Sequence, residues 1–148
     1  MSNNMVIMIG IQGSGKSEFY RRNLSDRYVR VNLDTLKTRN NENRLIQKCL
    51  EEGCDFAIDN TNPTRQERAR YIETAKANGY RVIGYFMQSR LRECIARNNL
   101  REGKERIPPK AIAATSNKLE LPNRDEGFDE LYFVANDGKT MTVSEWRN

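Results

Sequence analysis

An apolar pentapeptide, Met5–Ile9, runs straight into the octet GIQGSGKS at residues 10–17. A continuous apolar run of this kind is typical of a strand buried on both faces, as in a parallel sheet covered by helices. The octet fits the pattern G-x-x-x-x-G-K-[ST], and a helical pattern follows it over Lys16–Leu24. Strand, loop and helix together predict an α/β chain with a phosphate-binding loop after its first strand.

The chemistry of this loop follows from its residue types. Glycines let backbone N–H groups turn inward around a phosphate, and the start of the next helix adds the positive end of a dipole. Lys16 would reach the β- and γ-phosphates of a nucleotide, and the Ser17 hydroxyl would be a ligand of Mg²⁺. We therefore expect ATP or another nucleoside triphosphate, with Mg²⁺, at this loop. The expected nucleotide contacts are Gly10, Gln12, Gly13, Ser14, Gly15, Lys16 and Ser17.

The rest of the chain alternates strand and helix patterns. Strand patterns occupy Tyr28–Val31, Phe56–Ile58, Arg81–Met87 and Leu131–Val134, and helical patterns occupy Glu42–Glu52, Thr64–Asn78, Leu91–Leu100 and Pro108–Leu119. This order predicts a single three-layer P-loop domain over residues 1–148, with a parallel sheet of about four or five strands and helices on both faces. The tail, residues 135–148, fits either a hairpin around the turn NDG or a frayed end.

Composition excludes several classes of chemistry and location. The 148 residues contain no His, which removes Ser-His-Asp and Cys-His triads, His-ligated zinc and a His base. The three Cys residues, an odd number without metal-ligand spacing, favour reduced thiols in a cytoplasmic compartment. No apolar run approaches the roughly 20 residues that span a bilayer, so we expect no membrane partner.

Two acidic residues directly follow predicted strands. The segment VNLD closes the second strand at Asp34, and the segment AID closes the third at Asp59. Doubly wound sheets bind ligands at the carboxyl ends of their strands, so both carboxylates are expected near the phosphate loop. Phosphoryl transfer to a hydroxyl needs one acid that accepts a proton, which fits Asp34, and one that helps to hold the metal, which fits Asp59. The alternatives are an N-cap of a short turn over Thr35–Thr38 for Asp34 and turn formation for Asp59.

A basic segment, residues 97–108 (RNNLREGKERIP), joins two predicted helices. Arginine side chains at a joint made flexible by Gly103 can grip phosphate oxygens bidentately and neutralise charge on a transferred phosphoryl group. We expect a lid over the triphosphate, with Arg97 and Arg101 as nucleotide contacts. Arg101 is expected to be catalytic together with Lys16 and Asp34. The alternative is an exposed, charged helix end.

Several segments together resemble one family. VNLDTLK, AIDNTNPT, ARNNLREGKERIP and EGFDEL, at their spacing from GIQGSGKS, resemble the kinase domain of polynucleotide 5′-hydroxyl kinases. This family includes the phage-type enzymes and the kinase module of polynucleotide kinase-phosphatases. The resemblance covers roughly residues 5–134. It implies an adenylate-kinase-like P-loop fold and transfer of the γ-phosphate of ATP, with Mg²⁺, to the 5′-hydroxyl end of DNA or RNA.

The resemblance also implies roles for individual residues. Asp34 matches the family's general base and Arg101 its lid arginine. Lys37, three positions after the base, matches a basic residue that contacts the phosphate on the 3′ side of the substrate. Asp59 and Asn62 match an Asp-x-x-Asn segment that we assign to substrate binding, with Asp59 also expected at the metal.

Two departures from the family concern the acceptor. Leu33 stands immediately before the base, where the family usually has Arg, and Lys37 stands where Arg is common. Two other classes of function stay open. One is a P-loop kinase acting on a small-molecule hydroxyl, which needs the same machinery without a basic track. The other is a non-catalytic nucleotide-dependent switch, which needs no acceptor base.

The net charge of +5 is unevenly distributed. Residues 1–50 carry nine basic and four acidic side chains, and residues 90–110 carry seven and three. These two blocks would supply a track for a nucleic acid, or else a solvated surface. The sequence shows neither a D-x-D-x-T/V phosphatase motif nor a nucleotidyl-lysine ligase motif. We therefore expect other end-healing or ligase steps to come from other proteins.

Overall fold

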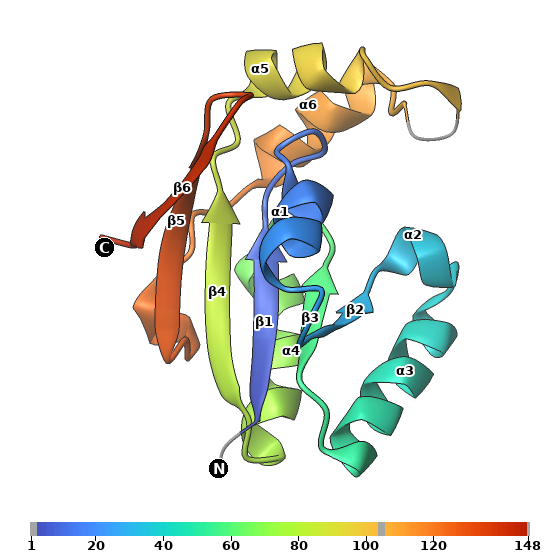
Figure 1. The fold of residues 1–148 in the computed structure, drawn as a ribbon, viewed down its shortest axis with the longest axis vertical. Coiled ribbons are helices and arrows are strands. Elements are labelled where there is room, and N and C mark those ends of the chain that lie inside the picture. The colour runs from blue at the N-terminus through green and yellow to red at the C-terminus, as the bar shows by residue number, and fades with distance from the viewer. Residues whose placement is uncertain (1–2, 104–105, 148) are drawn as a thin grey trace.

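The computed structural model describes residues 3–103 and 106–147 (Figure 1). Its helices are α1 (Lys16–Asn23), α2 (Leu33–Leu36), α3 (Arg39–Glu52), α4 (Arg65–Ala77), α5 (Leu91–Asn98) and α6 (Pro109–Lys118), with a 3-10 turn η2 (Arg124–Glu126). Its strands are β1 (Asn4–Ile9), β2 (Val29–Val31), β3 (Phe56–Asp59), β4 (Arg81–Met87), β5 (Glu130–Asn136) and β6 (Met141–Glu145).

Within the described residues these strands form a six-stranded sheet in the order β2-β3-β1-β4-β5-β6. All neighbouring strands are parallel except β6, which runs antiparallel to β5. The predicted parallel α/β sheet is confirmed, but the predicted four or five strands were too few, because the tail forms a hairpin. Its turn is stabilised by Asp137, whose Oδ1 accepts from the backbone nitrogens of Lys139 and Thr140, and by Gly138 at a φ of 92°.

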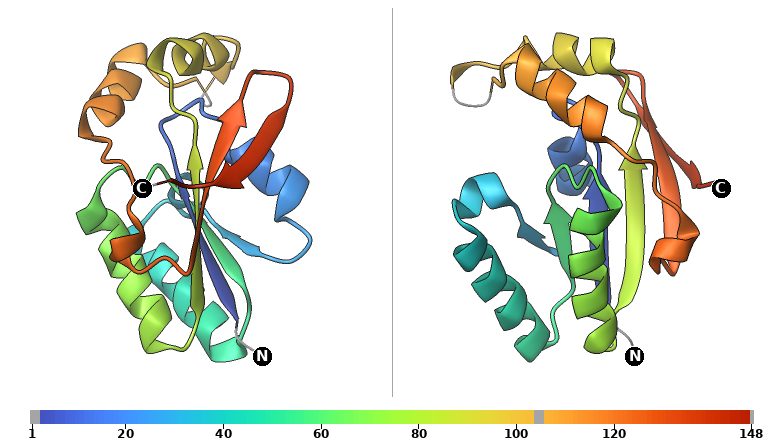
Figure 2. Two further views of the ribbon diagram at one scale, coloured as in Figure 1. Left: turned by 90° about the vertical axis from the view of Figure 1, so that its left-hand side faces the viewer. Right: turned by 180° about the vertical axis from the view of Figure 1, so that it is seen from behind.

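Helices cover both faces of the sheet, as predicted. Met5, Ile7 and Ile9 of β1 belong to a buried cluster that includes residues of α3 and α4. The alternate residues Val6 and Met8 belong to a second buried cluster that includes residues of α1. Figures 1 and 2 show α1 on one side of the sheet and α3 and α4 on the other. The continuous apolar run of β1 is therefore explained by burial on both of its faces.

Helices α5 and α6 lie across the carboxyl end of the sheet (Figure 1). A third buried cluster, made of Ile11, Cys94 and Ile112, packs the phosphate loop against both helices. The predicted lid segment begins in α5 and ends just before α6. Positions 104 and 105 of that segment lie outside the described residues. The described part of the lid is thus attached to helices that themselves pack on the loop.

The segment after β2 differs from the sequence-based expectation. A turn was expected over Thr35–Thr38, but a four-residue helix, α2, begins two residues earlier, at Leu33. The side chain of Asn32 caps this helix by accepting from the backbone nitrogen of Thr35 at 3.0 Å. The alternative role of Asp34 as an N-cap is therefore wrong. Thr38 caps α3, which begins at Arg39 rather than at Glu42.

Two expectations from composition can also be compared with the structure. Cys49, Cys54 and Cys94 all carry free thiols. Among residues 3–103 and 106–147, no helix combines the length and apolar character needed to cross a bilayer.

Candidate active site

The phosphate loop has two positions that only glycine can fill. Gly13 and Gly15 adopt φ angles of 82° and 98°. A Cβ on Gly13 would lie 2.4 Å from the carbonyl oxygen of Cys94 in α5, and one on Gly15 would lie 2.7 Å from the Nδ2 of Asn136 in β5. The loop is therefore packed closely between α5 and the end of β5, and its glycines allow backbone N–H groups to point toward a phosphate.

Other predicted loop contacts are mostly buried. A Cβ on Gly10 would lie 2.6 Å from the Oγ of Ser14, so this position is tight as well. The Oγ of Ser14 and the Oε1 of Gln12 are buried polar atoms without a hydrogen-bond partner. Such atoms are costly unless something binds them, and they suit a loop that wraps a polar ligand.

Lys16 lies at the centre of the site. Its Nζ donates to the carbonyl oxygens of Gly10 at 2.9 Å and Ile11 at 3.1 Å. Burial lowers the pKa of Lys16 to about 8, opposed by the carboxylates of Asp59 and Asp34 and reinforced by Arg101. Asp34 and Arg101, the other side chains predicted to be catalytic, therefore both lie close enough to Lys16 to affect the charge of its ammonium group.

Ser17 and Asp59, the two predicted metal ligands, lie side by side. The Ser17 hydroxyl donates to the Oδ2 of Asp59 at 3.4 Å. Asp59 is only 1% exposed, and its Oδ1 has no hydrogen-bond partner. A hydroxyl beside an unpartnered carboxylate oxygen fits Mg²⁺, which prefers oxygen ligands and takes several from water and phosphates. No cluster of three or more His, Cys, Asp or Glu exists among the described residues that could bind a metal by itself.

Arg30 is a member of this site that the sequence reasoning missed. Its Nε donates to the Oδ2 of Asp59 at 2.7 Å, and its Nη2 donates to the Oγ of Ser17 at 2.9 Å. Its guanidinium also lies over the ring of Tyr20, 5.9 Å from the ring centre. The available signal was the alternation in the strand VRV, which turns Arg30 away from Val31 and toward α1.

Asp34 and Lys37 lie at the two ends of α2 and are both exposed. Lys37 takes a φ of 78°, a left-handed conformation that is uncommon for a residue with a side chain. Two bonds tie the start of α2 to the end of β3. The Nδ2 of Asn32 donates to the carbonyl oxygen of Asp59 at 2.6 Å, and the backbone nitrogen of Leu33 donates to the Oδ1 of Asn60 at 2.9 Å. The two acidic strand ends are thus joined directly.

Asn62 is not brought together with the other predicted site residues. It is 4% exposed, and its Nδ2 donates to the carbonyl oxygen of Met8 at 2.7 Å. Its own carbonyl oxygen accepts from the Nη1 of the buried Arg68, which is also paired with Glu126. Asn62 therefore shapes the loop after β3 from inside the protein.

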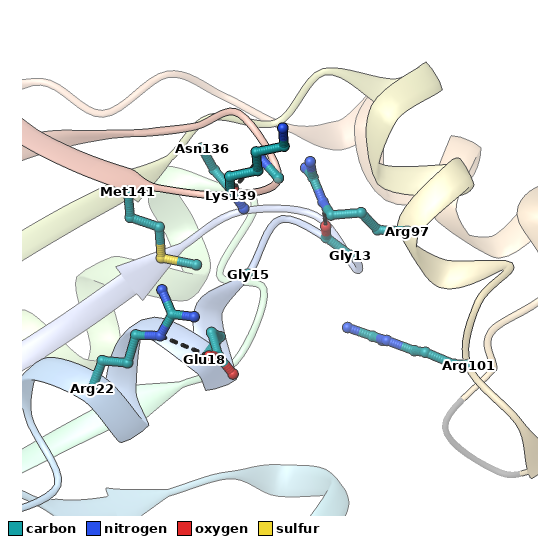
Figure 3. A pocket seen from close by; sticks show the side chains of 10 residues that line it. Gly13, Gly15, Glu18, Arg22, Arg97, Arg101, Asn136, Lys139 and Met141 are labelled. Carbon is teal, nitrogen blue, oxygen red and sulfur yellow. Dashed lines mark hydrogen bonds and ion pairs between the residues drawn. The ribbon is translucent and has the colours of Figure 1, made fainter.

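The segment predicted to be a lid contributes two arginines to a cavity of about 310 Å³ beside the phosphate loop. The Nε of Arg97 donates to the carbonyl oxygen of Gly13 at 2.7 Å. Figure 3 shows Arg97 and Arg101 extending from α5 and the segment after it, with Lys139 and Met141 on the opposite side. No sequence pattern pointed to the hairpin as a wall of this cavity. The lining residues are Gly13, Gly15, Glu18, Arg22, Arg97, Arg101, Asn136, Gly138, Lys139 and Met141.

Comparison with known proteins identifies the family. A family model described as an AAA domain (AAA_33) matches residues 37–122, more than half of the chain. The chain belongs to this family. The match begins after the phosphate loop of residues 10–17, and the P-loop kinase domain of this family agrees with the α/β sheet described above.

Two curated relatives match most of the chain. It is 28% identical over 133 residues to the bifunctional polynucleotide phosphatase/kinase of Schizosaccharomyces pombe, covering 86% of this chain and 32% of the relative. It is 33% identical over 138 residues to a putative protein of the same description from Acanthamoeba polyphaga mimivirus, covering 88% and 33%. The resemblance to polynucleotide kinases expected from the sequence is confirmed. The chain spans about a third of the length of these relatives.

Solved structures share the fold. A chain of the Pnkp1/Rnl/Hen1 RNA repair complex aligns with a TM-score of 0.67 and 24% identity, covering 80% of this chain and 44% of that one. A sugar kinase from Janibacter sp. HTCC2649 aligns with a TM-score of 0.70 and 17% identity, covering 90% and 85%. The predicted P-loop kinase fold is confirmed, and it is common to kinases of different acceptors.

Proposed function

We propose that this chain transfers the γ-phosphate of ATP to the 5′-hydroxyl end of a DNA or RNA strand. The observation that carries the proposal is the junction between α2 and β3. The Asn32–Asp59 bond holds Asp34, the candidate base, next to the strand end that faces the phosphate loop. A base placed beside a triphosphate loop is what transfer to an external hydroxyl requires.

The donor nucleotide would occupy the loop and the adjoining cavity. Its phosphates would lie on the loop backbone near Lys16, and its nucleoside in the cavity between Arg97 and the β5–β6 hairpin. Ser17 and Asp59 would hold Mg²⁺, which when bound neutralises phosphate charge. Arg101 would neutralise charge on the transferred group from the lid side.

The acceptor side rests on Asp34 and Lys37. The Asp34 carboxylate takes the proton of the 5′-hydroxyl, and the hydroxyl oxygen forms a bond to the γ-phosphorus. The bond between that phosphorus and the bridging oxygen breaks, and ADP leaves with the electron pair. Lys37, at the other end of α2, would contact a phosphate of the acceptor strand.

Two observations favour a nucleic acid as the acceptor. Both curated relatives are described as polynucleotide phosphatase/kinases, and the basic excess of residues 1–50 and 90–110 suits a polyanion. The second candidate is transfer to a small-molecule hydroxyl. It is supported by the fold shared with a sugar kinase. It is also supported by Leu33, which is uncharged where polynucleotide 5′-hydroxyl kinases usually have Arg. We further propose that companion end-healing steps belong to other domains or proteins.

The test is transfer of label from γ-³²P-ATP with Mg²⁺ to 5′-hydroxyl oligonucleotides of DNA and RNA. Label on the oligonucleotide that is lost in Asp34→Asn supports the proposal. Asp26→Asn, a change of an exposed acid beyond α1, is the matched control and should keep activity. Nucleotide binding without transfer to either strand overturns the nucleic-acid acceptor and favours a small-molecule hydroxyl.

A further inference from the structure

Glu42 is a buried acid that the proposed reaction does not use. Its side chain is 0% exposed, in α3 beside α4. It lies 3.0 Å from the Nη1 of Arg39, 3.5 Å from the Nη2 of Arg70 and 3.0 Å from the hydroxyl of Tyr71. Burying a carboxylate costs free energy unless it is paired and hydrogen-bonded, and an apolar side chain would avoid that cost. One further hydrogen bond of Glu42 gives a reason for a buried carboxylate at this position.

That contact is with Asn60, the residue immediately after Asp59. The Nδ2 of Asn60 donates to the Oε2 of Glu42 at 2.9 Å. A carboxylate can only accept hydrogen bonds, so the amide nitrogen of Asn60 must face it. The Oδ1 of Asn60 is thereby directed to the other side, where it accepts from the backbone nitrogen of Leu33 at 2.9 Å. Glu42 therefore fixes which end of the amide meets α2.

Leu33 begins α2 and directly precedes Asp34. Its backbone nitrogen belongs to the first turn, where N–H groups lack partners within the helix. A helix of four residues has too few internal bonds to hold its own direction. External bonds must do so: the Asn32–Asp59 bond already described, Asn60 at Leu33, and the Nδ2 of Asn41, which donates to the carbonyl oxygen of Leu36 at 2.8 Å.

We propose that Asn60, oriented by Glu42, is a positioning residue that holds Asp34 in place to accept the acceptor proton. The contacts run from Glu42 to the Asn60 amide, then to the Leu33 nitrogen and so to Asp34. This inference rests on the role of Asp34 in the proposed function. It adds two residues that act through Asp34.

A double-mutant cycle tests the proposal. Asn60→Ala should lower kcat roughly 10- to 100-fold, the cost of misplacing a reacting group by about an ångström, and leave the affinity for ATP unchanged. In an Asp34→Asn background the same change should cause no further loss, because Asn60 acts only through Asp34. Asn78→Ala, which removes an exposed amide at the end of α4, is the matched control and should keep full activity. Losses that multiply, or an unchanged kcat, would overturn the proposal.

A second readout does not depend on the acceptor. Amide hydrogen exchange at Leu33 should become faster in Asn60→Ala and in Glu42→Gln, while exchange in β1 stays slow. If Asn60→Ala fails to fold, Glu42→Gln keeps the shape of the side chain and carries the same test. Unchanged exchange at Leu33 in both variants refutes the positioning role. If the wild type labels a small-molecule hydroxyl and no oligonucleotide, the proposed acceptor is wrong, and the cycle is run with that small molecule.

Discussion

The guanidinium of Arg30 and the carboxylate of Asp59 form an ion pair of 2.7 Å that joins the adjacent strands β2 and β3. The same guanidinium reaches Ser17, so a partly exposed side chain of the edge strand β2 pairs with a buried acid beside the phosphate loop. This arrangement makes the stability of the site depend on a residue outside the loop.

Replacing Arg30 by Gln should reduce the free energy of unfolding by about 2 kcal/mol, because the buried Asp59 would lose its ion-pair partner. Urea unfolding measures this difference. Arg27→Gln is the matched control, since Arg27 pairs with Asp55 near the other end of β2 but is 60% exposed, and its loss should be much smaller. Equal losses in the two variants would show that the Asp59 pair has no special importance.

Gly13→Ala should abolish tight nucleotide binding. The new Cβ would meet the Cys94 carbonyl oxygen at 2.4 Å at a φ of 82°, so the loop or α5 must move. Calorimetric titration with ATP checks the result. Gly79→Ala separates the steric overlap from the backbone strain, because Gly79 also has a positive φ, 76°, but a Cβ there would have nothing within 4 Å. That variant should lose about 1 kcal/mol of stability and bind ATP normally.

Affinity for ATP should fall as the pH rises above about 8. The protonated form of Lys16 attracts phosphate, and burial lowers its pKa to about 8 in the free protein. Bound phosphates favour the charged form, so binding above this pH must take up a proton, and affinity should drop by roughly tenfold per pH unit. Calorimetry in buffers of different ionisation enthalpy measures the proton uptake. In Lys16→Arg, which stays charged, the decline should disappear; a decline that persists would assign it to another group.

Asn136→Ala should weaken ATP binding roughly tenfold and lower the free energy of unfolding by about 1–3 kcal/mol, because two hydrogen bonds of a buried side chain are lost. The Asn136 Nδ2 donates to the carbonyl oxygen of Ser14 at 3.0 Å, and its Oδ1 accepts from the backbone nitrogen of Gly138. Losing both bonds would loosen the loop and the hairpin turn together. Thr142→Ala, an exposed change on β6, is the control for ATP titrations. Equal affinities in the two variants would show that the hairpin does not support the loop.

The local parts of this fold could be predicted from the sequence. The strand, loop and helix around Lys16 follow each other without a break, and each has a strong residue pattern of its own. Helix α2 was missed because its four residues are too few for a helical period. The start of α3 was placed late because its apolar stripe begins only at Leu45, whereas the helix begins after its cap at Thr38 and its first turn already holds the buried Glu42.

The site could be predicted only where its residues follow strand ends or the glycine loop. Arg30, Asn60 and Asn136 act through partners distant in the chain, and no local pattern distinguishes them from ordinary strand or turn residues. Asn62 is the reverse case: its motif is clear, yet its amide serves the Met8 carbonyl inside the protein. Residue type and spacing identify a chemistry, whereas the direction of each side chain depends on pairing across the sheet.

The bond between Asn136 and Ser14 joins residues 122 positions apart. During synthesis the phosphate loop emerges well before β5, so the contact from Asn136 can form only after β4 has been laid beside β1. Until β5 has been made, a growing chain therefore carries a phosphate loop without its support from Asn136. Nucleotide binding would then follow the pairing of β5, and ATP would stabilise molecules in which β5 supports the loop in preference to those in which it does not.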